Sequence, residues 1–252
     1  MKKWSKVVVP VVFSCCLAGC ATSSATKSRQ HQADAIRQLG EAYLTEQNYS
    51  MALSELLKAE KLNAGDHLLH WDLGIAYMAK NELELAVSHF KKALAIKPDF
   101  AAARNSLGAA YLAMKDWDAA IDCFKLLTKD LLYGTPHYPL ANLGKAYYEK
   151  KDFVEAEKYY REALKMEPGF VNALYGLGRT YLSTGNVQKA AEYFELTVAA
   201  APLLPEAQFD LANAHRLLGN TEKARQGYAR VIALSPNSDL ARESKQALFD
   251  LK

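Results

Sequence analysis

The chain has 252 residues, of which 50% are apolar and 23% are charged, and this balance excludes an intrinsically disordered protein. Its formal net charge is +3, and three lysines in the first nineteen residues, which hold no acidic residue, account for all of it. The remainder of the chain is therefore neutral, so its charge gives no argument for a nucleic-acid-binding surface. We expect no nucleic-acid partner.

The N-terminal segment, residues 1–19, has the layout of an export signal. A basic start is followed by an apolar run over residues 7–17 and then by small residues. The run is too short to cross a bilayer as a helix. The motif Leu17-Ala18-Gly19-Cys20 resembles the lipobox of bacterial lipoproteins, which implies that Cys20 carries lipid and becomes the first mature residue. Ala21, in place of Asp, implies sorting to the outer membrane. The alternative is an ordinary signal peptide with an incidental cysteine.

Residues 20–31 are small and polar and show no helical or strand period. We therefore predict a flexible tether between the lipid and the folded body. Cys15 and Cys16 lie within the signal, so a lipidated Cys20 leaves Cys123 as the single thiol. A single thiol forms no internal disulfide, and Cys123 is interpreted as a small apolar residue on a helix.

A repeat of 34 residues, once lengthened to 36, runs through the rest of the chain. Each copy has a small residue after a leucine, then a tyrosine (once a histidine), an alanine and a large apolar residue at fixed spacing. The small residues are Gly40, Gly74, Gly108, Gly144, Gly178 and Ala212, and the large ones are Leu56, Phe90, Phe124, Tyr160, Phe194 and Tyr228. Each copy is interpreted as two helices that cross closely at the small residues, with the large side chain packing against the next pair.

This pattern resembles the tetratricopeptide repeat, from about residue 33 to residue 236. The resemblance implies an all-α fold, a right-handed α–α superhelix of six repeats with a C-terminal capping helix. The expected domain is residues 32–252, with repeats at 33–66, 67–100, 101–136, 137–170, 171–204 and 205–238 and the capping helix at 239–252.

The sequence lacks the motifs that carry catalysis. It has no phosphate-binding glycine loop, no G-x-S-x-G, no H-E-x-x-H and no C-x-x-C. His67 and His70 are three residues apart and could share a helix face, but the sequence offers no third ligand beside them. We predict a chain that is not an enzyme and that uses no cofactor, metal or small-molecule substrate. An enzyme or metal-binding protein that uses the two histidines is the remaining alternative.

A superhelix of this kind has a concave groove lined by the first helix of each repeat. In this family the second, fifth, ninth and twelfth positions of a repeat face the groove. The candidate partner-binding residues at these positions are Trp71, Met78, Tyr138, Lys145, Tyr148, Tyr175, Arg179, Phe209, Asn213 and Arg216. Asn105 and Asn172 occupy groove positions as well. Aromatic side chains beside arginine are typical of protein-binding surfaces. The alternative is that some of the aromatic residues pack within their own repeats.

The repeat is interrupted at residues 129–139, where two extra residues enter between the third and fourth copies. Pro139 follows Pro136, which moves the predicted start of the next helix to His137 or Tyr138. The junction, with its Thr135-Pro136 and the Ala141-Asn142-Leu143-Gly144 that follows, resembles the PilF/PilW family of outer-membrane lipoproteins. Tyr133 is the candidate contact at this junction.

The resemblance implies a lipid-anchored scaffold on the periplasmic face of the outer membrane. Such a scaffold promotes type IV pilus biogenesis in a pilotin-like role, by assisting the localisation or assembly of the secretin. The expected partners are the pilus secretin or another pilus assembly component, and the membrane through the lipid on Cys20. The alternative interpretation is an envelope adaptor for peptidoglycan enzymes or for outer-membrane assembly.

Overall fold

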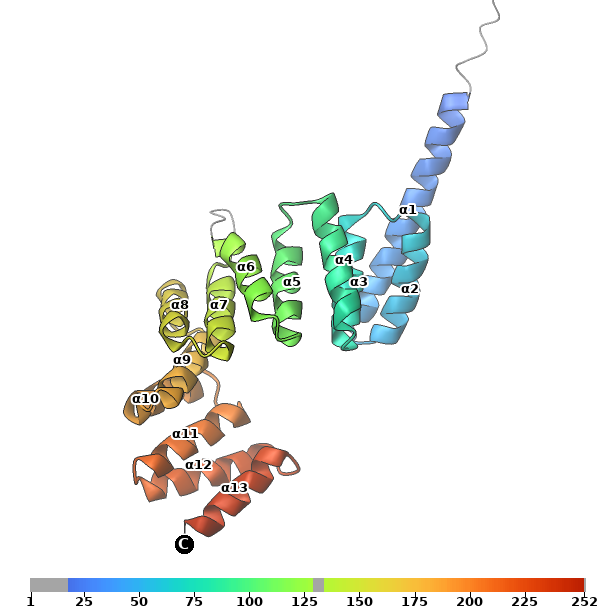
Figure 1. Ribbon diagram of the computed structural model, residues 1–252. Coiled ribbons are helices and arrows are strands. Elements are labelled where there is room, and N and C mark those ends of the chain that lie inside the picture. Colours follow the sequence, from blue (N-terminus) through green and yellow to red (C-terminus); the bar gives the residue numbers. More distant parts are fainter. Residues whose placement is uncertain (1–17, 129–133, 252) are drawn as a thin grey trace, which may run out of the picture. The chain divides into compact units, whose positions relative to one another are not determined.

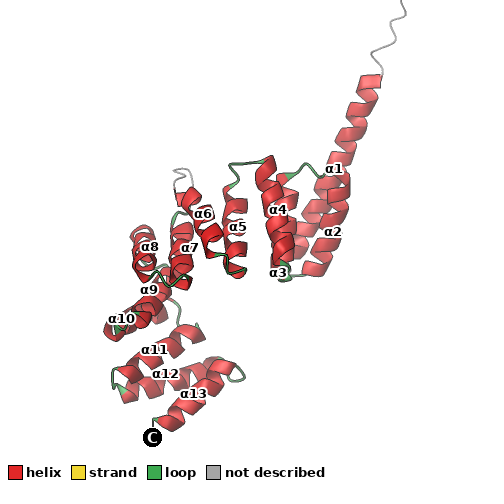
Figure 2. Ribbon diagram, in the orientation of Figure 1, coloured by secondary structure: helices red, strands yellow, loops and turns green. Residues whose placement is uncertain are grey.

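The computed structural model describes residues 18–128 and 134–251. Within these ranges the chain forms helices and no strands, which confirms the predicted all-α fold (Figure 1). Figure 2 shows the same helices joined by short loops. The helices are α1 Ala18–Thr45, α2 Tyr49–Leu62, α3 His67–Ala79, α4 Leu83–Ile96, α5 Ala101–Ala113, α6 Trp117–Thr128, α7 His137–Glu149, α8 Phe153–Met166, α9 Val171–Ser183, α10 Val187–Ala200, α11 Pro205–Leu217, α12 Thr221–Leu234 and α13 Asp239–Asp250. None of these helices combines the length and the apolar character that a membrane crossing needs. Residues 1–17 of the predicted signal and the junction residue Tyr133 lie outside the described ranges.

The chain divides into two compact units, and the division lies near the end of the second repeat. The first unit ends at Pro98 and contains α1 to α4, and the second begins at Asp99 and contains α5 to α13. The sequence predicts one domain over residues 32–252, with a repeat boundary at residue 100. The division between the units therefore lies within two residues of a predicted repeat boundary.

The close crossing of paired helices explains the small residue of the repeat. Within the two units α3 packs on α4, and α9 packs on α10. A Cβ atom placed on Gly74 would lie 2.4 Å from the Phe90 ring, and one on Gly178 would lie 2.5 Å from the Phe194 ring. Both rings are fully buried. Since no Cβ atom is tolerated at such distances, only glycine lets the ring enter the crossing.

Tyr160 of α8 shows how the large side chain also reaches the next repeat. A Cβ atom on Gly144, in its own repeat, would lie 2.6 Å from the ring, and one on Gly176, in the next repeat, would lie 2.2 Å from it. The side chain is only 4% exposed. At this interface the large side chain packs against the next pair, as the sequence predicts.

A residue in the left-handed region joins the two helices of each repeat. Positive φ angles occur at Gln47, Asn81, Lys115, Lys151, Gly185 and Gly219. Side chains at the start of several second helices then cap them: Asn48, Asp152 and Asn186 each accept a hydrogen bond from the backbone N–H three residues further on. Turn geometry and capping therefore agree on where α2, α8 and α10 begin.

Residues 20–31 are helical, which corrects the predicted flexible tether. They belong to α1, which continues without interruption into the first repeat, and Figure 1 shows its first half extending beyond α2. The sequence from 20 to 39 contains no glycine or proline, and alanine, glutamine and arginine in it favour a helix. Ala33 is buried, whereas residues 26–32 are exposed. The helix therefore extends from its packed part, because adding residues to an existing helix is far easier than nucleating one.

The fourth repeat begins where the sequence predicts. Helix α7 starts at His137, and Pro139 lies in its first turn, where the missing N–H would have no partner within the helix. The backbone N–H of Tyr138 donates to the carbonyl oxygen of Thr135 at 3.2 Å and closes the turn before the helix. The two prolines therefore stop helical structure before residue 137 without disturbing α7.

Replacing Gly176 with alanine should destabilise the second unit by about 1–3 kcal/mol, because the added Cβ collides with the buried ring of Tyr160. Urea unfolding followed by circular dichroism measures the change. Gly169→Ala is the matched control, since a Cβ there would meet nothing within 4 Å, and it should change stability by less than about 0.5 kcal/mol. Equal losses in both variants would contradict the crossing model.

Candidate partner-binding site

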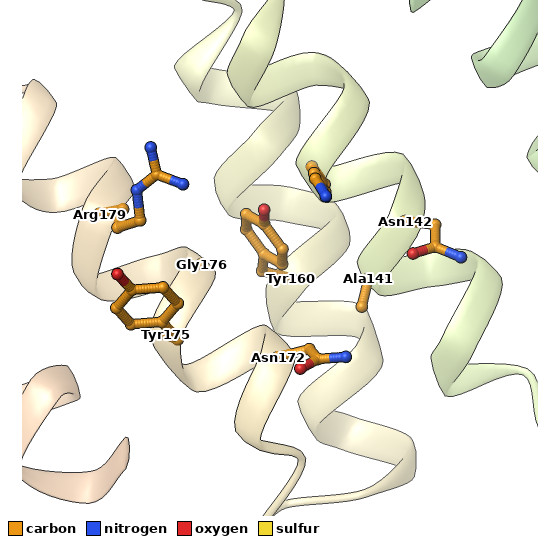
Figure 3. Close-up of a pocket in the computed structure, with 8 residues that line it drawn as sticks. Ala141, Asn142, Tyr160, Asn172, Tyr175, Gly176 and Arg179 are labelled. Carbon is orange, nitrogen blue, oxygen red and sulfur yellow. The ribbon is translucent and has the colours of Figure 1, made fainter. Parts of the chain in front are cut away.

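A pocket of about 250 Å³ opens in the second unit between α7 and α9. Its lining comes from α7, α8 and α9 and consists of Ala141, Asn142, Lys145, Tyr160, Asn172, Tyr175, Gly176 and Arg179. Figure 3 shows Asn142 on one side, Tyr175 and Arg179 on the other, and the ring of Tyr160 between them. The pocket therefore joins an aromatic base to polar and cationic walls.

Helical spacing brings the polar side chains of the pocket to common faces. On α9, Asn172, Tyr175 and Arg179 follow one another at intervals of three and four residues, which places them on one face. On α7, Asn142 and Lys145 are three residues apart. Helices α7 and α9 are the first helices of consecutive repeats and lie side by side.

A recurring polar contact links the first helices of consecutive repeats. The side chain at the fifth position of one repeat bonds to the side chain at the sixth position of the next. The three pairs are Arg37 Nη1 to Asp72 Oδ2 at 2.9 Å, Asn142 Nδ2 to Asn105 Oδ1 at 3.4 Å, and Tyr175 Oη to Asp210 Oδ2 at 2.8 Å. Between the fourth and fifth repeats these positions hold Ala141 and Gly176, which have no polar side chain. The pocket opens at this interface, where no polar pair joins the fifth and sixth positions.

Arg179 is the central cation of the pocket. Its guanidinium lies 4.6 Å from the ring centroid of Tyr148 and 6.0 Å from that of Tyr175, so two aromatic faces hold it. Lys145 is exposed on the facing helix. Within the described ranges neither cation forms a salt bridge, whereas many other basic residues do. Against the effect of burial, Glu149 and Asp210 lie near enough to help raise the pKa of Arg179, but neither contacts it as an ion pair, so both cations can still receive an acidic group.

Tyr175 and Asp210 fix the wall of the pocket on α9. The tyrosine hydroxyl donates to the Asp210 carboxylate at 2.8 Å. Burial raises the pKa of Asp210 above its usual value, and the hydrogen bond from Tyr175 opposes that rise. Burial also raises the pKa of Tyr175, so its hydroxyl stays protonated and remains a donor. The pair therefore holds the Tyr175 ring beside Arg179.

Two asparagines give the pocket both donors and acceptors. Asn172 is exposed, and Asn142 is half-buried and bonded to Asn105. An amide side chain pairs equally well with the N–H and the C=O of an extended peptide. Together with the cations and the tyrosine rings, the amides make an arrangement suited to a peptide segment that carries a carboxylate.

The structure brings together four of the predicted groove residues. Lys145, Tyr175 and Arg179 line the pocket, and Tyr148 contacts it through Arg179. Tyr138 is 46% exposed, and its ring lies 5.0 Å from that of Phe170, beside the pocket but outside its lining.

The other predicted groove residues lie elsewhere. Phe209 packs against the buried cluster of Ala212, Ala224 and Tyr228, and with Arg216 it lines a separate pocket of about 380 Å³. Asn213 accepts a hydrogen bond from the Tyr228 hydroxyl at 2.7 Å, so it braces the sixth repeat. Trp71 and Met78 are half-buried on α3 of the first unit.

The sequence prediction did not include three residues that shape the pocket. Asn142 and Asp210 occupy the sixth position of their repeats, and Tyr160 is the large residue of a second helix. The sequence did hold a signal for Asn142 and Asp210. In the second to sixth repeats the sixth position, which faces the preceding repeat, is always polar or glycine. The groove positions of the family leave that position out.

Models of the tetratricopeptide repeat match four stretches of the chain. The model described as TPR repeat covers residues 76–115, and models described as Tetratricopeptide repeat cover 99–167, 142–205 and 206–238. Together they span more than half of the chain. The chain belongs to the tetratricopeptide-repeat proteins, and it is a scaffold of the kind that binds other proteins. No curated protein sequence matches it significantly.

Solved structures share the fold over most of the chain. The crystal structure of PilW, a widely conserved type IV pilus biogenesis factor, is 24% identical with a TM-score of 0.77, covering 84% of this chain and 97% of that one. PilF of Pseudomonas aeruginosa is 20% identical with a TM-score of 0.73, covering 87% and 99%. YrrB, a TPR protein with an unusual peptide-binding site, is 21% identical with a TM-score of 0.53, covering 76% and 97%. The repeat fold is thus shared with two pilus proteins over nearly their whole solved length.

Replacing Tyr175 with phenylalanine should cost about 1–3 kcal/mol at neutral pH, because the buried Asp210 carboxylate loses its hydroxyl donor. The pKa of Asp210, already raised by burial, should rise further. The folded state then binds the proton more tightly than the unfolded chain, so stability falls as pH rises above the unfolded pKa. Urea unfolding should therefore show a smaller loss near about pH 4 than near about pH 7.

Tyr148→Phe is the matched control for this variant. The Tyr148 hydroxyl lies 3.1 Å from the hydroxyl of Ser183 at an exposed position, so its loss should cost less than about 0.5 kcal/mol at either pH. A Tyr175→Phe loss that is the same at both pH values would contradict the role given to Asp210.

Proposed function

We propose that this chain is a lipid-anchored scaffold on the periplasmic face of the outer membrane that promotes type IV pilus biogenesis. In a pilotin-like role it binds the pilus secretin, or another pilus assembly component, and assists its localisation or assembly. The similarity of the fold to PilW and PilF over most of the chain supports this assignment. The observation that carries it is the α7–α9 pocket, where Lys145 and Arg179 line one space and, among the described residues, neither forms a salt bridge.

The chemistry of the pocket indicates the kind of segment that it receives. Arg179 is held between two tyrosine rings and presents a planar set of donors, which matches a carboxylate. Asn142 and Asn172 line the same pocket, and their amides can pair with the backbone of the segment that enters it. The partner is therefore a peptide segment of the secretin that is acidic and extended where it enters the pocket.

The membrane anchor rests on the sequence around Cys20. The Leu-Ala-Gly-Cys motif supplies the acylation site, and the Ala21 that follows suits retention at the outer membrane. Helix α1 then leads directly from this position into the first repeat. The anchor and the pocket serve one role, since the lipid fixes the scaffold at the membrane where the secretin ring assembles.

A strain that lacks the chain should lose pili and multimeric secretin, and the wild-type chain should restore both. The double variant Lys145→Ala/Asn172→Ala should restore them poorly, and capture of the secretin by the purified variant should weaken by roughly tenfold. Both side chains are exposed, so the melting temperature should stay unchanged. Electron microscopy of pili and a pull-down of the secretin check these outcomes.

Lys165→Ala is the matched control for the double variant, because Lys165 is an exposed lysine on α8 outside this pocket. It should bind the secretin and restore pili like the wild type. Normal pili in the deletion strain would reject the pilus role and favour an envelope adaptor for peptidoglycan enzymes or outer-membrane assembly. Unweakened capture by the double variant would place the binding surface elsewhere.

Replacing Cys20 with serine should release the chain from the outer-membrane fraction, because serine cannot carry the thioether-linked lipid. Labelling with a palmitate analogue followed by membrane fractionation measures this. Cys123→Ser, at a buried position of α6, should leave both labelling and fractionation unchanged. Continued labelling of Cys20→Ser would reject the lipobox assignment.

A further inference from the structure

Two histidines and a glutamate from three helices meet in the first unit. Glu60 lies on α2, His70 on α3 and His89 on α4. The Nδ1 atoms of His70 and His89 are 3.1 Å apart, and His70 Nδ1 is 3.8 Å from Glu60 Oε1. One ligand atom from each of the three residues lies within 4.8 Å of the other two.

The imidazole of His70 is oriented as metal-binding histidines are. Its Nε2 lies 3.0 Å from the carbonyl oxygen of Ala64, which can only accept, so Nε2 carries the proton and Nδ1 presents a lone pair to the cluster. The ring of His89 stacks on Tyr77 with the centroids 5.3 Å apart and the planes at 25°. Both histidines are buried, at 3% and 6% exposure, so neither ring turns freely.

We propose that Glu60, His70 and His89 form a binding site for Zn²⁺. In a tetrahedral zinc site with bonds of 2.0–2.1 Å, neighbouring nitrogen and oxygen ligands lie about 3.3 Å apart. The observed 3.1 Å and 3.8 Å fall on either side of that value. The carboxylate of Glu60 is 25% exposed and completes the site by a small rotation, which leaves the fourth position to water.

Zinc would bind where the proton between the two Nδ1 atoms lies in the metal-free protein. In the metal-free protein the His70 lone pair accepts the Nδ1–H of His89. On binding, the proton of His89 moves to Nε2, its Nδ1 lone pair turns to the metal, and the ring stays neutral. Two neutral imidazoles and one carboxylate suit zinc, whereas Mg²⁺ and Ca²⁺ prefer oxygen ligands alone.

The nearby Lys92 both favours and opposes metal binding: it helps to keep His89 neutral, and it pairs with the Glu60 carboxylate. Burial first, and then the nearby Lys92, lowers the pKa of His89 to about 4, so this imidazole is neutral and able to bind a metal at neutral pH. Lys92 Nζ lies 3.4 Å from Glu60 Oε1 and competes for that carboxylate. The lysine side chain is 50% exposed and can move away when the metal enters.

From the sequence, His67 and His70 are the alternative candidates for metal ligands. The structure instead places His70 beside Glu60 and His89. His67 Nδ1 lies 3.8 Å from Asp66 Oδ1 and is not a member of the cluster. His89 and Glu60 are distant in sequence and sit on second helices, whose residues the groove pattern does not cover. His67 therefore serves as the internal control.

The test is zinc titration of the full chain after treatment with a chelator, by calorimetry. We expect one Zn²⁺ per chain, an increase in melting temperature with zinc, and no response to Mg²⁺. Glu60→Gln and His89→Gln should each weaken zinc affinity by roughly tenfold or more. His67→Ala should leave the affinity unchanged, and Lys92→Ala should strengthen it severalfold by removing the competing cation.

These measurements distinguish zinc binding at this cluster from zinc binding elsewhere on the chain. Affinity that is equal in the wild type and in the His70→Gln/His89→Gln double variant would overturn the proposal, as would the absence of binding by the wild type. Circular dichroism reports whether the buried histidine variants fold. If they do not, the Glu60→Gln and Lys92→Ala variants, at partly exposed positions, decide the matter, because the site requires their affinities to move in opposite directions.

Discussion

In the first five repeats the two helices approach one another so closely that a Cβ atom added to the glycine of the first helix would lie inside the large side chain of the second. The distances are 2.6, 2.4, 2.6, 2.6 and 2.5 Å at Gly40, Gly74, Gly108, Gly144 and Gly178. Each of these glycines admits one large buried side chain, and each such burial contributes roughly 1.5–3 kcal/mol. The crossing also fixes the rotation of the first helix, and with it the residues that face the neighbouring repeat.

The sixth repeat meets the same constraint from the other side. Its first helix has Ala212 where the others have glycine, and the second helix has Gly227 opposite it. A Cβ atom on Gly227 would lie 2.7 Å from Cβ of Ala212. The methyl group that Ala212 adds to the first helix is accommodated because Gly227 has no side chain on the second. The two helices therefore cross closely here too, and Tyr228 remains fully buried.

Because the crossings hold the first helices in register, the contacts between repeats recur at equivalent positions. An arginine–aspartate, an asparagine–asparagine and a tyrosine–aspartate pair join the fifth and sixth positions at three interfaces. Burial raises the pKa of Asp72, in the first of these pairs, to about 6, although Arg37 opposes the rise. Burying a charged side chain at these interfaces costs free energy. At the interface of Ala141 and Gly176 there is no such pair, and the small residues leave the space of the pocket.

Properties that depend on one repeat could be predicted from the sequence. Glycine, alanine and large apolar residues at fixed spacing gave the paired helices, and Pro139 gave the start of α7 at His137. Properties that depend on contacts between repeats could not. The Tyr175–Asp210 bond and the cluster of Glu60, His70 and His89 join residues that only the packing of helices brings together. The tether was predicted wrongly because composition shows low hydrophobicity but not the continuation of a helix that is already packed at Ala33.

The continuity of α1 has a mechanical consequence for an anchored chain. Thirteen residues separate Cys20 from the packed Ala33, and in helical form they span about 20 Å. A random coil of the same length has a similar average reach but no fixed direction. A lipid on Cys20 would therefore be joined to the first repeat by a stiff helix, and the distance between the two would vary little. The first repeat would move as a unit with this helix, so a partner would bind without ordering a coil between the lipid and the repeat.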